Sequence, residues 1–226
     1  KNKFPDALII AGGEHVTALP GFCLEDCPGL DVCVKGEGEN TFLELLEALG
    51  DGRDFAELHG LVYRGPNGEI KETAGLPRVR NVDDIAWPDW KEGYLERFWA
   101  AGKSYGPQTE RDMPMTFSRG CLFQCTFCSN PTMWTTRYVL RDVDDVIAEV
   151  KHHIDRYNIT AVQLYDLTAI TKKRWAVELF TKLIDEGIKL NWSFPSGTRS
   201  EALDEETLQL LKDAGCNYLV FAPESG

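Results

Sequence analysis

The feature that most limits how this chain can fold is a regular alternation of strand-like and helix-like segments after residue 113. Four short apolar runs are predicted to be strands, at 113–119, 160–166, 189–197 and 217–224. Three amphipathic segments between them are predicted to be helices, at 141–158, 172–187 and 204–215. A helix between two strands is typical of parallel strands joined by crossovers. We therefore expect an α/β fold with a parallel sheet.

Polar or charged side chains stand at the carboxyl ends of all four predicted strands. They are Arg119, Asp166, Ser196 and Glu224. The carboxyl ends of parallel strands share one edge of the sheet, and this edge is where barrels and open sheets bind their ligands. The sequence therefore predicts that the functional site lies at this edge.

The N-terminal part repeats a smaller α/β plan. Strands are predicted at 6–13 and 31–39, each carrying glycines, and a hairpin is predicted at 61–72 around Pro66, Asn67 and Gly68. A helix is predicted at 40–52, with Asn40 as its N-cap and Phe42, Leu45, Leu46 and Leu49 on its apolar face.

Residues 73–113 are irregular and rich in proline, glycine and tryptophan. Because a flexible linker would not carry Trp87, Trp90 and Trp99, we expect this segment to be packed by its aromatic side chains. The predicted domains are therefore residues 1–72, a linker at 73–112, and residues 113–226.

Composition narrows the possible partners and the cellular compartment. The net charge of −12 disfavours nucleic acid, since binding of nucleic acid depends on neutralising phosphates. The basic run at 172–174 is interpreted as a solvated helix face. No apolar run is long enough to span a bilayer, and the start of the chain does not resemble a signal peptide. Seven cysteines in such a chain favour a reducing, cytoplasmic location. The missing initiator Met and the end directly after a strand suggest a piece of a longer protein.

Three cysteines, Cys121, Cys125 and Cys128, lie close together after the first predicted strand of the alternating region. Thiolates are soft ligands that suit zinc, copper or iron–sulfur clusters. Three of them can hold three corners of a [4Fe–4S] cluster and leave the fourth iron open. The alternative is a structural zinc site with a remote fourth ligand. The other four cysteines, at 23, 27, 33 and 216, are expected to be small, buried and inert thiols.

The spacing Cys121-Leu-Phe-Gln-Cys125-Thr-Phe127-Cys128 resembles the signature of radical S-adenosylmethionine (radical SAM) enzymes. This resemblance implies that the three cysteines hold a [4Fe–4S] cluster and that the amino and carboxylate groups of SAM chelate its open iron. It also places Phe127 near the adenine. Reductive cleavage of SAM in this family gives a 5′-deoxyadenosyl radical that abstracts hydrogen from the substrate. The family fold is a partial (βα)6 barrel, of which this chain would carry the first four βα units.

The same resemblance implies further SAM-binding residues. Asp166 ends the second strand, where the family approaches the amino group of SAM, although the usual Gly-Gly-Glu is missing here. Ser196, Thr198 and Arg199 would bind the ribose and the carboxylate, and Glu224 and Ser225 would meet SAM or the substrate. The alternatives are a plain polar turn at 196–201 and a structural ion pair between Glu224 and Arg199.

The N-terminal part resembles the C-terminal half of a Rossmann-like cobalamin-binding domain fused ahead of a radical SAM core. The cobalamin contacts implied by this resemblance are Gly12, Gly13, Gly36, Glu37 and Gly38. The motif that supplies an axial histidine would lie before residue 1. The alternative interpretation is a pair of plain βα turns, with Glu37 as a helix N-terminal charge.

Together, the segments "QCTFCSNPTMWTTRY", "YDLTAI", "PSGTRSEALD" and "FAPESG" resemble one branch of cobalamin-dependent radical SAM enzymes. That branch contains anaerobic magnesium-protoporphyrin monomethyl ester cyclases and several C- and P-methyltransferases. The leading expectation is cobalamin-dependent methyl transfer to an unactivated carbon or phosphorus centre of a small molecule. The alternatives are an oxidative cyclase acting on a tetrapyrrole, a methylthiotransferase and a non-enzymatic iron–sulfur electron carrier. The expected partners are the substrate and a low-potential electron donor such as flavodoxin or ferredoxin, with neither nucleic acid nor membrane.

Overall fold

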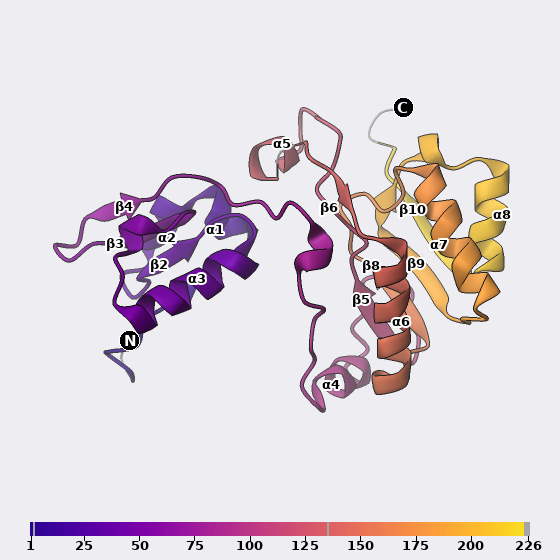
Figure 1. Cartoon of the computed structure of the whole chain (residues 1–226), viewed down its shortest axis with the longest axis horizontal. Helices are drawn as coiled ribbons and strands as arrows, with labels where there is room; N and C mark the ends of the chain where they lie inside the picture. Colours follow the sequence, from indigo (N-terminus) through magenta and orange to yellow (C-terminus); the bar gives the residue numbers. More distant parts are fainter. Residues whose placement is uncertain (2, 135, 224–226) are drawn as a thin grey trace. The chain divides into compact units, whose positions relative to one another are not determined.

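The computed structural model describes residue 1 and residues 3–134 and 136–223 (Figure 1). These residues form two compact units. The first contains residues 1–80 and 124–134, and the second contains residues 81–123 and 136–223. Residues 81–112, which the sequence assigns to a linker, thus lie within the second unit. The functional domain boundaries inferred from the sequence remain predictions.

The first unit is built on a four-stranded sheet in the order β1-β2-β3-β4. Its strands are β1 (Ile10–Ala11), β2 (Val32–Val34), β3 (Leu61–Arg64) and β4 (Ile70–Glu72). Strands β1 and β2 are parallel, and β3 pairs antiparallel with both β2 and β4. The expected hairpin at 61–72 is therefore confirmed.

Helices cover both faces of this sheet. Successive strand residues point to opposite faces, so each strand contributes side chains to two cores. The helices are α1 (Glu14–Ala18), α2 (Pro20–Asp26) and α3 (Gly38–Asp51), followed by a short 3-10 turn (Phe55–Glu57). Val32 and Val34 pack against Leu45 of α3. Cys33 and Val62 face the other way and pack with α1 and α2.

The helix expected at 40–52 begins earlier and buries a different face. It starts at Gly38 after Glu37, so the prediction of Asn40 as N-cap is wrong. Its buried residues are Thr41, Leu45 and Ala48. Phe42, Leu46 and Leu49 lie next to this face on the helix and are 44–47% exposed. The strand expected at 6–13 is also shorter, since only Ile10–Ala11 pair with β2.

The second unit contains the predicted parallel sheet, in the order β10-β9-β8-β5. Its strands are β5 (Asp112–Met115), β8 (Ala161–Leu164), β9 (Asn191–Thr198) and β10 (Cys216–Phe221), and every neighbouring pair is parallel. The crossover helices are α6 (Val143–Tyr157), α7 (Lys173–Asp185) and α8 (Glu205–Asp213). The alternation in the sequence therefore correctly predicts an α/β fold with parallel strands.

The core of this unit lies between the sheet and its helices. Val146 and Val150 of α6 and Phe180 of α7 belong to the same buried cluster as Trp192 and Phe194 of β9. Two of the helices start at aspartates, which are preferred N-cap residues because the carboxylate accepts hydrogen bonds from the first backbone N–H groups. Asp142 accepts hydrogen bonds from backbone N–H groups at the start of α6, and Asp204 does so at the start of α8.

The first strand of the alternating region is divided in two, unlike the single strand expected at 113–119. β5 ends at Met115, and Ser118–Arg119 forms β6. β6 leaves the parallel sheet and pairs antiparallel with β7 (Val139–Leu140). This pairing joins the two ends of the cysteine loop (residues 120–138), which also contains the short helix α5 (Asn130–Met133).

The aromatic residues of segment 81–112 are packed, as expected. This segment contains a 3-10 turn (Val82–Asp84) and helix α4 (Tyr94–Ala100). Trp87 Nε1 donates to Asp145 of α6 at 3.1 Å, and Trp99 Nε1 donates to the carbonyl of Asp112 at 2.7 Å. None of the helices in the described residues combines the length and the apolar character needed to cross a bilayer.

Candidate functional site

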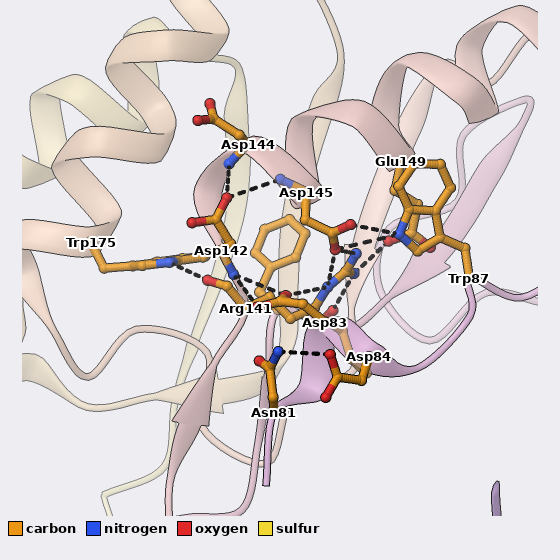
Figure 2. Close-up of polar contacts among 12 residues, drawn as sticks. Asn81, Asp83, Asp84, Trp87, Arg141, Asp142, Asp144, Asp145, Glu149 and Trp175 are labelled. Carbon is orange, nitrogen blue, oxygen red and sulfur yellow. Dashed lines mark hydrogen bonds and ion pairs between the residues drawn. The ribbon is translucent and has the colours of Figure 1, made fainter. Parts of the chain in front are cut away.

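The base of the cysteine loop is held by Arg141, directly after β7. Its backbone N–H donates to the carbonyl of Phe117 at 2.9 Å, and its guanidinium donates to the carbonyl of Thr116 at 3.1 Å. Figure 2 shows the guanidinium between Asp145 and Glu149 of α6, and it forms ion pairs with both. Burial lowers the pKa of Arg141, but the hydrogen bonds to these two carboxylates outweigh burial and raise it. Arg141 therefore ties the base of the loop to α6.

Asp166, after β8, also contacts the residues just before the cysteine loop. Its carboxylate is 1% exposed and accepts hydrogen bonds from the backbone N–H of Phe117, at 3.0 and 3.1 Å, and from the hydroxyl of Ser118. Burial raises the pKa of Asp166 to about 6, although these hydrogen bonds act in the opposite direction. The carboxylate thus binds the chain that leads into the cysteine loop. Its expected role at the amino group of SAM stays a prediction.

The segment after β8 also contacts the first cysteine. Cys121 Sγ lies 3.3 Å from Thr168 Oγ1, and Tyr138, at the far end of the loop, donates its hydroxyl to the carbonyl of Thr168 at 3.4 Å. Thr168 is 6% exposed. Asp166 and Thr168 together therefore contact both ends of the cysteine loop. Sequence reasoning missed Thr168, Tyr138 and Arg141, because no motif marks a residue whose role depends on a long-range contact.

The second and third cysteines form a local turn. Cys128 N–H donates to the carbonyl of Cys125 at 3.0 Å, and Asn130 N–H donates to Cys128 Sγ at 3.4 Å. The ring of Phe127, between them, is 68% exposed. An exposed ring between two ligand candidates is free to stack on a planar group.

The donor chemistry of the loop fits an iron–sulfur cluster. Within the described residues, Cys121, Cys125 and Cys128 form no disulfide, and N–H···S contacts such as the one to Cys128 are typical of the surroundings of cluster cysteines. Within the described part of the chain, no three His, Cys, Asp or Glu side chains are gathered closely enough to hold a metal ion. The cluster assignment therefore depends on the motif and on donor type.

The four remaining cysteines behave in part as expected. Cys33 is buried, and burial raises the pKa of its thiol and of the Cys216 thiol to about 11 in each case. Cys27 is exposed, and Cys23 and Cys216 are half-buried, so the expectation that all four are buried is wrong for these three. Cys23 lies on α2 and packs partly against the core of the first unit, and Cys27 is the C-cap of that helix.

The residues expected to bind SAM at the end of β9 make contacts within the chain. Ser196 donates to the carbonyl of Leu164 at 3.2 Å, and Thr198 Oγ1 lies 3.3–3.4 Å from the backbone of Ile170. Arg199 pairs with Glu201 at 2.7 Å. These contacts agree with the alternative of a structured polar turn, and the SAM contacts stay predictions. The expected roles of Glu224 and Ser225 concern residues outside the described part of the chain.

The glycine turns of the first unit differ in how open they are. Strands β1 and β2 are parallel, so the turns that follow them share one sheet edge. Gly13 has φ 97°, and a Cβ there would meet nothing within 4 Å. A Cβ on Gly12 would make an ordinary contact of 3.7 Å with the carbonyl oxygen of Val34. The Gly12–Gly13 turn therefore leaves room for a ligand.

The second turn is filled by the chain itself. Gly36 has φ 72°, and a Cβ there would lie 2.8 Å from the carbonyl oxygen of Pro77. Glu37 is 3% exposed, accepts the N–H of Val79 and lies 3.9 Å from Arg78 Nε. Gly38 is the first residue of α3. Residues 76–79 thus cover this turn, and any ligand role of Gly36, Glu37 and Gly38 stays a prediction.

The curated relatives that match nearly all of this chain include a methyltransferase and a cyclase. Cytidylyl-2-hydroxyethylphosphonate methyltransferase of Streptomyces wedmorensis is 31% identical over 244 residues, which cover 98% of this chain and 45% of the relative. Anaerobic magnesium-protoporphyrin IX monomethyl ester cyclase of Rubrivivax gelatinosus is 30% identical over 228 residues, covering 100% of this chain and 40% of the relative. The chain therefore spans less than half the length of either relative.

The fold is also similar to that of a solved protein. The structure of the radical SAM methyltransferase TsrM from Kitasatospora setae, with cobalamin and a [4Fe–4S] cluster bound, has a TM-score of 0.74. Sequence identity is 22%, and the match covers 97% of this chain and 44% of TsrM. The family model described as the radical SAM superfamily matches residues 115–226, which include all three cysteines of the motif. The chain belongs to the radical SAM superfamily.

Proposed function

We propose that this chain is the core of an enzyme that cleaves SAM reductively at a [4Fe–4S] cluster and uses the resulting radical for cobalamin-dependent methyl transfer. The acceptor would be an unactivated carbon or phosphorus centre of a small molecule. The observation that carries the proposal is the loop with three cysteines in the family spacing, whose first cysteine and base are held by Asp166, Thr168 and Arg141. The methyltransferase relative supports methyl transfer.

The residues of the loop and of the adjacent strand ends have separate roles in this proposal. Cys121, Cys125 and Cys128 would hold the cluster, which supplies the electron for cleavage of SAM. Phe127 would stack on the adenine through its exposed ring. Asp166, Ser196, Thr198, Arg199, Glu224 and Ser225 are the candidates for the polar groups of SAM. Of these, Arg199 has the side chain best suited to a carboxylate.

The first unit would bind cobalamin as part of a Rossmann-like domain. The open turn at Gly12–Gly13 is the best-supported contact, since it lies at the carboxyl edge of two parallel strands and has free space above it. The second unit would contribute the first four βα units of a partial (βα)6 barrel. The reaction would take place in the reducing cytoplasm, with flavodoxin or ferredoxin as the electron donor.

A second candidate is anaerobic oxidative cyclisation of a tetrapyrrole. It is favoured by the cyclase relative, which is 30% identical over the whole of this chain. Both candidates share the cluster, SAM and the radical, and they differ in the fate of the substrate. Labelled methyl from SAM in the product would support methyl transfer, whereas loss of substrate hydrogens without label would support the cyclase.

The central test is formation of 5′-deoxyadenosine. The full-length protein is reconstituted with iron and sulfide under anaerobic conditions, reduced, and mixed with SAM. Cys125→Ala should abolish both the cluster absorbance and 5′-deoxyadenosine. Cys27→Ala is the matched control, because it removes an exposed thiol outside the motif and should leave both unchanged. An intact cluster in the unsubstituted protein that never yields 5′-deoxyadenosine would refute the proposal.

Cobalamin binding is tested separately, by the corrinoid absorbance of the full-length protein. Gly12→Ala is the informative variant, because the chain has room for its Cβ and any loss of corrinoid then reports a ligand contact. Gly50→Ala, on α3 with nothing within 4 Å of the added Cβ, is the control. A protein that binds no corrinoid after reconstitution would limit the proposal to radical SAM chemistry without cobalamin.

A further inference from the structure

Thr168 places a buried hydroxyl against the first cysteine of the motif. Its Oγ1 lies 3.3 Å from Cys121 Sγ, within hydrogen-bonding distance for sulfur, and both residues belong to the second unit. The backbone of Thr168 is fixed by the hydroxyl of Tyr138, which is itself 9% exposed. The hydroxyl is therefore held in place beside Cys121.

The state of Cys121 decides which atom donates in this contact. The Thr168 hydroxyl has one hydrogen, and it has two acceptors within reach, the carbonyl of Leu167 at 2.9 Å and Cys121 Sγ. While Cys121 is a thiol, its S–H can donate to Thr168, whose own hydrogen goes to Leu167. A cysteine that ligates iron is a thiolate and can only accept. An anionic acceptor binds the hydroxyl hydrogen more strongly than a neutral carbonyl does.

We propose that Thr168 is a positioning residue that donates a hydrogen bond to the Cys121 thiolate and raises the reduction potential of the cluster. This inference rests on the proposed function, because it presupposes the cluster. A hydrogen bond to a ligating sulfur stabilises the reduced cluster more than the oxidised one, since the reduced cluster carries more negative charge on its sulfurs. Burial of Thr168 keeps water from replacing this bond.

Thr168 is also the side chain through which this effect can be altered. The sulfur of Cys128 accepts a backbone N–H, from Asn130, and only a proline at position 130 would remove that donor, while also constraining the backbone. The Thr168 donor, by contrast, is lost in Thr168→Val, which keeps the shape of the side chain. It is kept in Thr168→Ser, which loses the methyl group. The two variants therefore separate the hydrogen bond from packing.

The experiment is a potentiometric titration of the full-length, anaerobically reconstituted protein, followed by the EPR signal of the reduced cluster. Iron content and circular dichroism are measured in parallel. Thr168→Val should shift the midpoint potential to a more negative value, while Thr168→Ser should stay near the unsubstituted protein. Thr171→Val is the matched control on the same segment, since the buried Thr171 hydroxyl makes no hydrogen bond within the described part of the chain. It should leave the potential unchanged.

The outcomes distinguish this inference from the proposed function. If the unsubstituted protein forms no [4Fe–4S] cluster, the proposed function fails and this inference falls with it. If the cluster forms and Thr168→Val has the unsubstituted potential at full iron content, the inference alone is overturned. A shift in Thr168→Ser equal to that in Thr168→Val would also overturn it, by showing a packing effect. Should Thr168→Val take up too little iron to titrate, Thr168→Ala must show the same negative shift.

Discussion

The guanidinium carbon of Arg199 lies 3.8 Å from the centre of the Phe123 ring. Phe123 stands between Cys121 and Cys125, so this contact joins the end of β9 to the cysteine loop within the second unit. Arg199 also pairs with Glu201, which holds the guanidinium over the ring. The residue expected at the carboxylate of SAM thus also contacts the loop that would carry the cluster.

The contact between Arg199 and Phe123 should be measurable as a coupling in a double-mutant cycle. We expect Arg199→Ala and Phe123→Leu each to destabilise the protein, and their coupling free energy to be about 0.5–1 kcal/mol, the range for cation–π pairs at exposed sites. The measurement is urea unfolding of the two single variants and the double variant. Strictly additive effects would show that the two side chains do not stabilise each other.

Arg141 should be among the most sensitive positions for stability. Its guanidinium lies between the carboxylates of Asp145 and Glu149, and the Glu149 side chain is only 3% exposed. Arg141→Met removes the guanidinium from both carboxylates and leaves Trp87 at Asp145 and His153 at Glu149. This loss should cost about 3–5 kcal/mol in the free energy of unfolding.

Lys182→Met is the control for Arg141. Lys182 pairs at an exposed position with Asp144, which lies on α6 like Asp145 and Glu149. It should change the free energy of unfolding very little. Equal losses in the Arg141 and Lys182 variants would contradict the interpretation of Arg141 as a buried ion pair.

Asp166 should make stability depend on pH in the mildly acidic range. Burial raises its pKa from 3.8 to about 6, so the folded protein binds a proton that the unfolded chain releases between these values. The contribution of Asp166 to stability is therefore complete below pH 3.8 and is lost as the pH rises through about 6.

The contribution of Asp166 is isolated by comparing the free energy of unfolding of the unsubstituted protein with that of Asp166→Asn at each pH. The amide of this variant does not titrate, and its oxygen can still accept the N–H of Phe117. The stability of the unsubstituted protein relative to this variant should fall as the pH is raised from about 4 to about 6. Unfolding by urea over this range gives the difference directly. A difference that rises with pH would mean that the native pKa of Asp166 is lowered instead.

Gly36 should tolerate no side chain. In Gly36→Ala, the Cβ would meet the carbonyl oxygen of Pro77 at 2.8 Å, and φ 72° alone costs about 1–2 kcal/mol for a residue with a Cβ. Gly21→Ala is the control, since Gly21 lies in α2 with open space around it and should be neutral or stabilising. Thermal unfolding of both variants checks this. An unchanged midpoint in Gly36→Ala would mean that residues 76–79 do not cover this turn.

Local patterns in the sequence were enough for the main elements. The spacing of apolar residues predicted the parallel strands and crossover helices of the second unit, because a strand or helix that buries one face carries its period in the chain. The turn residues 66–68 predicted the hairpin between β3 and β4. The cysteine spacing predicted the superfamily through its resemblance to the family signature, because that signature lies within one short stretch of sequence.

Only the tertiary structure decided which contacts the polar residues make. It divided the strand at 113–119 so that Ser118 pairs with Leu140, and it turned Asp166 to Phe117 and Thr168 to Cys121. It also filled the turn at Gly36 with Pro77 while leaving the turn at Gly13 open. These contacts join residues that are tens of positions apart. Nothing in the local sequence encodes them, because they depend on how separate elements pack.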